Sequence, residues 1–301
     1  MAKFGTAGNS RSFYDAGFKA SVQAPAWLAA RGLDAYEYAA GRGVALSDDT
    51  ARAIGEEARR WGISVSIHAP YYINCAALDP EKREKSFGYI MDSARVVTLM
   101  GGTRVVFHPG SEKGGHDEAL ERTLEFLREC IARLDAQGYS HINLCPETMG
   151  KCNTLGTLDD VIALCGVDAR VVPTLDFAHI HARGQGALNT EADFERVLAQ
   201  LERGLWPEHT GDMPWRLRNF HAHFSHVQYA ASGERKHVSF ADDGYGPDFG
   251  QLARVLARRG LEPTVICESR DTQTEDAAAM RDMFAVARRE FADGLRERKT
   301  Q

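Results

Sequence analysis

Eight short apolar runs recur along this chain, and a helical pattern separates most of them. The runs are rich in β-branched residues or alternate apolar with small polar residues, which is typical of strands. The expected strands are 3–9 (ending in a Gly-rich loop), 33–38, 63–67, 104–107, 142–145, 170–175, 219–225 and 263–267. The expected helices are 48–61, 80–100, 117–136, 158–164, 191–201, 249–258 and 277–295. Strand–helix alternation predicts parallel strands joined by crossovers.

Eight such units in 301 residues fit an α/β fold, a single (β/α)8 TIM barrel over residues 1–301. A doubly wound open sheet is the alternative fold. No Gly-x-Gly-x-x-Gly follows the first strand to support it. No change in composition marks a second domain, so we expect one barrel.

Composition narrows the class of protein. A net charge of -6 argues against a generally basic nucleic-acid-binding surface, but it leaves room for a local basic groove. The six cysteines form no Cys-x-x-Cys pair and are typical of a reduced, cytosolic protein. No N-terminal run resembles a signal peptide, and no stretch approaches ~20 apolar residues. We predict a cytoplasmic monomer with no membrane partner.

A histidine or a carboxylate stands at the end of six successive strands. These residues are His68, His108, Glu147, Asp176, His223 and Glu268. In a (β/α)8 barrel they would meet at the carboxyl-terminal mouth, where crowded carboxylates repel one another and lose hydration. Divalent ions would relieve this, and imidazole with carboxylate suits zinc or manganese. Singly, each residue could instead cap the next helix or bond nearby backbone.

The choice of ligand in the seventh strand is open, because His221 has the same parity as His223. Two further ligand candidates, His179 and His237, are expected in loops. Tyr71 and Tyr72 follow His68 closely and suggest a surface that contacts a flat group, with packing at the barrel rim as the alternative.

Six stretches share their order and spacing with one known family. They are His68-Ala69-Pro70-Tyr71, His108-Pro109-Gly110, Pro146-Glu147-Thr148, Leu175-Asp176-x-x-His179, His223-Phe224-Ser225 and Cys267-Glu268. The chain resembles a divergent branch of the endonuclease IV family of apurinic/apyrimidinic endonucleases, which are (β/α)8 barrels with three zinc ions.

The resemblance implies a ligand set. His68 and His108 would hold one zinc, and Asp176, His223 and Glu268 a second, with Glu147 bridging the two as the catalytic carboxylate. His179 and His237 would hold a third. The family places an Asp two residues before that last histidine, where this chain has Arg235. We favour Glu234 as the replacement ligand; otherwise the third site is incomplete, weaker or missing.

The resemblance also implies a reaction and a partner. The expected activity is hydrolysis of the phosphodiester 5′ to abasic sites in duplex DNA, a step of base excision repair, with two or three Zn2+ ions, or Mn2+ in their place. Tyr71 and Tyr72 would act as wedges in the duplex. Arg42 and Lys151 would meet backbone phosphates.

Two other functions fit parts of the pattern. A sugar isomerase or epimerase of the xylose-isomerase-like barrel group would use one metal on Glu147, Asp176, His223 and Glu268. The remaining histidines exceed what a one-metal site needs. A non-catalytic barrel that binds damaged DNA is the second alternative, and an incomplete third site would favour it.

Overall fold

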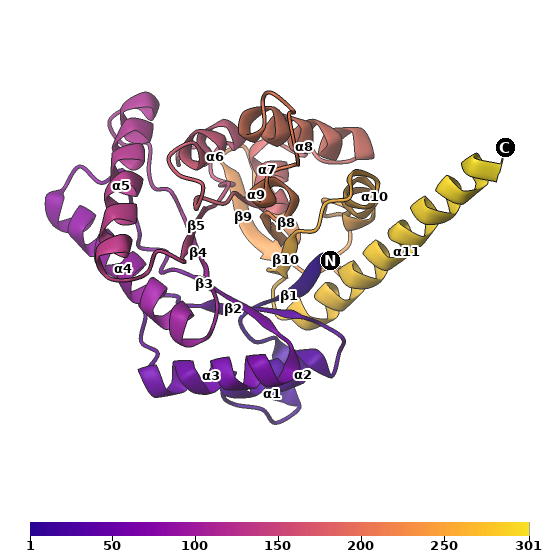
Figure 1. Ribbon diagram of the computed structural model, residues 1–301, viewed down its shortest axis with the longest axis horizontal. Coiled ribbons are helices and arrows are strands. Elements are labelled where there is room, and N and C mark those ends of the chain that lie inside the picture. Colours follow the sequence, from indigo (N-terminus) through magenta and orange to yellow (C-terminus); the bar gives the residue numbers. More distant parts are fainter. Residues whose placement is uncertain (301) are drawn as a thin grey trace.

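Eight parallel strands surround the centre of the molecule as a nearly closed barrel (Figure 1). The computed structural model describes the backbone of residues 1–300 and the side chains of residues 1–296. The barrel strands are β1 (Lys3–Ala7), β2 (Ala35–Ala39), β3 (Ser64–His68), β4 (Arg104–Phe107), β5 (Asn143–Pro146), β6 (Thr174–Asp176), β7 (His221–Phe224) and β10 (Thr264–Cys267). They are ordered β5-β4-β3-β2-β1-β10-β7-β6. Parallel bridges from Leu144 to Val171 and from Glu147 to Thr174 join β5 to β6.

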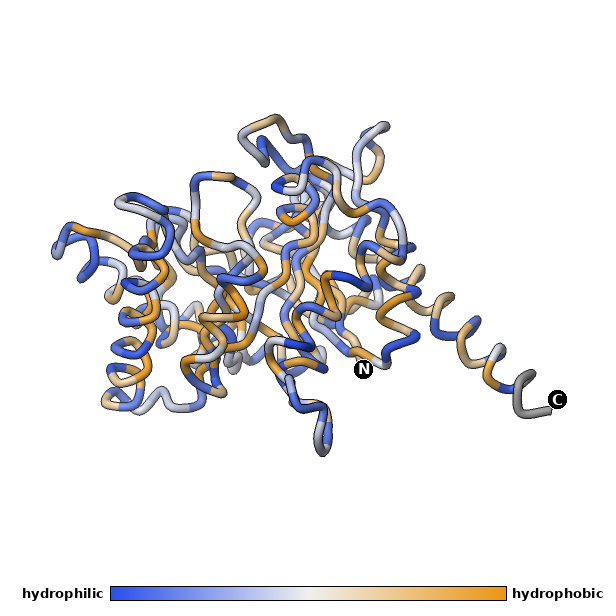
Figure 2. Tube along the Cα trace, turned by 90° about the horizontal axis from the view of Figure 1, so that it is seen from above, coloured by the Kyte–Doolittle hydropathy of each residue, from blue (hydrophilic) through white to orange (hydrophobic). Residues whose placement is uncertain are grey.

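Helices form the outer layer. The longer ones are α3 (Asp48–Trp61), α4 (Pro80–Leu99), α5 (His116–Ala136), α6 (Leu158–Cys165), α8 (Glu191–Leu205), α10 (Phe249–Arg259) and α11 (Gln273–Thr300). The shorter ones are α1 (Arg11–Asp15), η1 (Ser21–Gln23), α2 (Ala24–Ala29), α7 (Phe177–Arg183) and α9 (Trp215–Arg218). Figure 2 shows apolar residues gathered toward the middle of the molecule, and Figure 1 shows α11 extending past the barrel.

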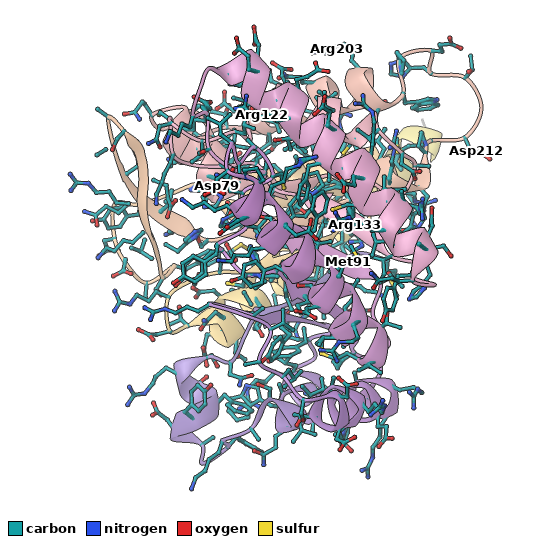
Figure 3. The ribbon with its side chains drawn as sticks, turned by 90° about the vertical axis from the view of Figure 1, so that its left-hand side faces the viewer. Asp79, Met91, Arg122, Arg133, Arg203 and Asp212 are labelled. Atoms are coloured by element: carbon teal, nitrogen blue, oxygen red, sulfur yellow. The ribbon has the colours of Figure 1, made fainter. Side chains whose placement is uncertain are left out.

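Local sequence signals set the helix boundaries. Ser47 accepts a hydrogen bond from the Thr50 amide at the start of α3, and Gly62 ends that helix at a φ of 70°. A side-chain cap of this kind contributes about 1 kcal/mol to stability. Figure 3 shows α4 and α5 side by side on one flank, with Asp79 at the start of α4 and Arg133 on α5. The Arg133 guanidinium lies 3.9 Å from the centre of the Phe87 ring.

The structure confirms the predicted barrel, and it corrects several elements. A two-stranded antiparallel hairpin, β8 (His226–Ala230) and β9 (Gly233–Val238), stands where a loop was expected. Helix α7 begins directly after Asp176, because the Asp176 carboxylate accepts from the His179 amide and caps it. Strand β6 begins only at Thr174, after Pro173, which has no N–H to donate. Within residues 1–300, no helix is both long and apolar enough to cross a membrane.

Candidate metal centre

The six strand-end residues meet at the carboxyl end of the barrel. A cavity of about 760 Å³ opens there, and its walls include His68, His108, Glu147, His179, Glu234, His237 and Glu268. Asp176 and His223 have no exposed surface. The described residues contain three groups of potential ligands at this mouth, each with its ligand atoms within 4.8 Å of one another.

The first group contains His68, His108 and Glu147. The Nε2 atoms of both histidines lie 3.2 Å from Glu147 Oε2. His68 Nδ1 lies 2.8 Å from the Ala69 carbonyl, which can only accept, so Nδ1 carries the ring proton. Nε2 of His68 therefore faces a carboxylate, and either a proton or a metal ion between the two atoms would satisfy both.

The second group contains Glu147, Asp176, His223 and Glu268. His223 Nδ1 lies 3.1 Å from Glu147 Oε1 and 3.5 Å from Glu268 Oε2. Asp176 uses one oxygen to cap α7, and its Oδ2 is buried with no hydrogen-bond partner. A buried carboxylate oxygen that accepts no hydrogen bond is costly, and a bound metal ion would supply a partner. The donor set thus fits a divalent ion.

The third group contains Asp176, His179 and His237. His179 Nδ1 donates to the Thr148 carbonyl at 2.9 Å, which leaves Nε2 facing Glu234 Oε2 at 3.6 Å. The Ser225 hydroxyl donates to the His226 carbonyl, so it accepts from His237 Nδ1 at 2.6 Å. His237 Nε2 then lies 4.0 Å from Glu234 Oε1.

A β-bulge brings Glu234 to this group. Tyr229 pairs with Glu234 and Gln228 pairs with Lys236, so Arg235 is the extra residue of β9. Residues three apart in a regular strand point to opposite faces, but one inserted residue restores the same face. Glu234 and His237 both line the cavity, while Arg235 is exposed to solvent. The expectation that His179 and His237 lie in loops is wrong, because His179 is on α7 and His237 is on β9.

The charges of the centre are balanced by protons on its histidines. Burial lowers the pKa of His68, but Glu147 more than offsets this and raises that pKa to about 9. For His179, Asp176 and Glu147 outweigh burial and raise the pKa to about 10. Burial raises the pKa of Asp176 to about 6. Burial also acts to raise the pKa of Glu147, but the histidines around it hold that pKa well below its ordinary value.

The residues expected to contact DNA lie at the cavity rim or line the cavity. Tyr71 and Tyr72 are 48% and 53% exposed, and their ring centres are 4.6 Å apart. They therefore leave half of their surface free instead of packing into the rim. Arg42 Nε donates to the Tyr71 hydroxyl at 3.0 Å. Lys151 lines the cavity and is exposed.

Sequence reasoning missed Glu37, which is fully buried in the barrel interior. Its carboxylate lies 2.8 Å from His223 Nε2 and 3.0 Å from His221 Nε2. Burial lowers the pKa of His221 to about 4, so this ring is neutral. A signal was present in the sequence, because a carboxylate in the middle of a central strand needs a buried partner. His221 lies below the mouth, so His223 is the residue of β7 that reaches the centre.

These observations define the class of protein: a (β/α)8 barrel whose carboxyl-terminal mouth carries three groups of histidines and carboxylates that could hold metal ions. Residues 25–289 match the xylose isomerase-like TIM barrel family, and the chain belongs to that family. An uncharacterized protein of Methanocaldococcus jannaschii is 32% identical over 270 residues, which cover 89% of this chain and 92% of the relative.

Relatives that carry a functional name match a smaller part of the chain. A probable endonuclease 4 of Acholeplasma laidlawii is 34% identical over 140 residues, 44% of this chain and 46% of that protein. The match thus spans about half the length of the Acholeplasma laidlawii protein. The resemblance to endonuclease IV is confirmed as that of a divergent relative, and such relatives indicate an enzyme of the xylose isomerase-like barrel group.

Solved structures agree on the fold. Endonuclease IV from Thermus thermophilus superposes with a TM-score of 0.63 at 24% identity, covering 90% of this chain and 94% of that one. A D-tagatose 3-epimerase-like protein also reaches 0.63, at 18% identity, covering 87% of this chain and 91% of that one. The barrel is therefore shared by nucleases and epimerases, and the choice between them depends on the site.

Proposed function

We propose that this protein is a metal-dependent apurinic/apyrimidinic endonuclease that hydrolyses the phosphodiester 5′ to abasic sites in duplex DNA. The observation that carries the proposal is the set of histidines beyond a one-metal site. His68 and His108 form a group with Glu147, while His179 and His237 form another with Asp176. A one-metal isomerase needs neither group. The partial match to endonuclease 4 relatives supports the same interpretation.

The roles of the residues follow from their contacts. Two or three zinc or manganese ions, when bound, would supply Lewis-acid stabilisation of the phosphate and an activated water. Glu147 lies within 3.3 Å of histidines from both the first and the third group, so it links the ligand sets as the central carboxylate. Glu234 would take the place of the family's Asp at the third ion. Asp176, His223 and Glu268 would complete the second.

The rim residues would bind and orient the DNA. The exposed Tyr71–Tyr72 pair presents apolar ring surface above the cavity, suited to the gap that a missing base leaves in a duplex. Arg42 and Lys151 would contact backbone phosphates beside it. We expect Tyr72→Ala to weaken binding of abasic duplex about tenfold, as for loss of one stacking contact. Trp61→Ala, which removes an exposed aromatic at the opposite end of the barrel, should leave binding unchanged.

The test is incision of a duplex that carries one tetrahydrofuran abasic analogue, by protein of measured metal content. We expect a single cut 5′ to the analogue, its loss after chelation and its return with zinc or manganese. Glu147→Gln should lose the activity, whereas Glu202→Gln, a carboxylate paired with Arg259 outside the barrel, should keep it. A fully metallated protein that leaves the duplex intact would contradict the proposal.

One observation favours a second candidate function. Glu147, Asp176, His223 and Glu268 form a compact group with the residue types of a one-metal sugar isomerase or epimerase. Metal stoichiometry separates the two functions. Two or three ions per chain agree with the nuclease, and one ion together with turnover of a ketose agrees with the epimerase.

A further inference from the structure

A second polar group lies beneath the metal centre, inside the barrel. It contains Glu37 on β2, Ser66 on β3, Arg104 on β4 and His221 on β7. Glu37 and His221 are fully buried, and Ser66 is 4% exposed. The interior of a (β/α)8 barrel is ordinarily filled with branched apolar side chains, and a buried carboxylate is costly unless it is paired. We therefore expect this group to support a specific neighbouring side chain.

The proton positions in the group follow from Arg104, which can only donate. Its Nη1 lies 3.3 Å from His221 Nδ1, so Nδ1 accepts and the ring proton is on Nε2. That nitrogen lies 3.0 Å from Glu37 Oε2. The Ser66 hydroxyl donates to the same oxygen at 2.7 Å. Oε2 of Glu37 thus accepts from Ser66 and lies beside the His221 ring, and its other oxygen remains for a further donor.

The donor to that other oxygen is His223. Its Nε2 lies 2.8 Å from Glu37 Oε1, and a carboxylate oxygen can only accept, so Nε2 carries the proton. His223 Nδ1 then faces the centre, 3.1 Å from Glu147 and 3.5 Å from Glu268. A bare lone pair facing two carboxylates is repulsive, so Nδ1 holds a proton when no metal is bound and is the atom free to bind a metal ion in its place.

We propose that Glu37 is a positioning residue that fixes the orientation and tautomer of the His223 ring, so that Nδ1 is the atom offered to the metal. Arg104, His221 and Ser66 in turn hold Glu37 in place. The inference rests on the proposed metal centre. In this arrangement His223 offers Nδ1 to the metal, whereas His68, His179 and His237 all present Nε2.

A separate ion site is the other interpretation of this group, since Glu37, His221 and His223 offer ligand atoms within 4.8 Å of one another. The 2.8 Å separation between His223 Nε2 and Glu37 Oε1 is that of a direct hydrogen bond, which leaves no room for an ion between these two atoms. The Arg104 cation beside His221 also opposes a second positive charge. The geometry is that of a hydrogen-bonded support.

Glu37→Gln tests the role through zinc affinity, measured by competition with a chromophoric chelator. An amide accepts at only one of its two terminal atoms, so its NH2 group would face either the His223 Nε2 proton or the Ser66 hydroxyl beside the His221 ring. We expect one zinc to bind about 10- to 100-fold more weakly, as when such supporting partners are lost, with unchanged stoichiometry at saturation. Asp160→Asn, which removes a buried carboxylate that caps α6, should leave zinc affinity unchanged. Wild-type affinity in Glu37→Gln, or loss of one whole ion at saturation, would overturn the proposal.

A second measurement needs no variant at Glu37. In ¹⁵N-histidine-labelled protein loaded with ¹¹³Cd, the metal should couple to Nδ1 of His223 and to Nε2 of His68, with His223→Asn identifying the signal. Coupling to Nε2 of His223 would contradict the proposed tautomer. Absence of any bound metal would remove both this inference and the proposed function. Metal binding as expected without DNA incision would remove only the latter.

Discussion

At the metal centre, His68, His179 and His237 each present the same ring nitrogen to the carboxylates. In each ring Nδ1 donates a hydrogen bond to an oxygen: the Ala69 carbonyl, the Thr148 carbonyl or the Ser225 hydroxyl. Such contacts fix the tautomer and the plane of a ligand ring before a metal arrives. The rings need not reorient on loading, so little ordering entropy opposes metal binding.

Glu234 and Arg235 provide a direct test of the third ion at the level of single residues. We expect Glu234→Ala to lower the zinc content by one ion per chain, because Glu234 is the carboxylate nearest to His179 Nε2, at 3.6 Å. Arg235→Ala should retain the full content, because that side chain is exposed. Mass spectrometry of the native protein counts the ions. Equal zinc content in the two variants would exclude Glu234 as a ligand.

At the scale of elements, the β8–β9 hairpin supplies Glu234 and His237, two candidate ligands that no barrel strand carries. Its bulge gives the Glu-Arg-Lys-His sequence the geometry of an acid and a histidine two residues apart. Deleting Arg235 should produce a regular strand with both side chains still on one face, and so preserve the zinc content. Inserting one alanine between Lys236 and His237 should instead turn His237 away and cost one ion. Loss of zinc in the deletion variant would contradict the role of the bulge.

Helices α5 and α6 are joined by a histidine outside the candidate metal centre. His116, at the start of α5, lies 3.0 Å from Glu112 and 3.0 Å from Asp160. The hydrogen bond to Glu112 raises the pKa of His116 above its ordinary value. The stabilisation of the fold by protonated His116 is therefore complete below the unfolded-state pKa of histidine, about 6.5. It is lost as pH rises through the folded-state pKa of His116.

His116→Asn should remove this pH-dependent contribution to stability. Because the side chain is 39% exposed, we expect the difference in unfolding free energy to stay below about 1 kcal/mol. Thermal unfolding at pH 6 and pH 9 measures it, and the gap in Tm between wild type and variant should be larger at pH 6. A gap that widens toward pH 9 would reverse the sign and refute the assignment.

The meeting of the strand-end residues could be predicted from the sequence because parallel barrel strands bring all their carboxyl ends to one face. His68 and Glu268, 200 residues apart, needed only that rule. The hairpin could not be predicted in this way, since its Glu234–Lys236 segment is polar and is held by pairing with β8 instead of by the core. The partners of Glu37 could not be identified from the sequence, because nothing in a linear sequence shows that His221 and Arg104 lie across the barrel from it.

At the scale of the whole molecule, the candidate metal centre brings together elements from most of the chain. Its candidate ligands come from β3, β7 and α7 as well as from the ends of β4, β5, β6 and β10 and from the hairpin. Without ions, Glu147 and Asp176 rely on protonated histidines for compensation, as the raised pKa values of His68 and His179 show. Metal binding should therefore stabilise the barrel as a unit and not one local segment.

Metal removal tests this coupling. Each ion present at 100 times its Kd stabilises the folded state by about 2.7 kcal/mol if the unfolded chain does not bind it. Each kcal/mol raises Tm by roughly 2–4 °C in a domain of about this size. We expect chelated protein to unfold at least several degrees below the zinc-loaded form in calorimetry, with one cooperative transition in both, and zinc to restore the difference in a concentration-dependent way. An unchanged Tm in protein shown to be free of metal would mean that the strand-end residues hold no ion that matters to the fold.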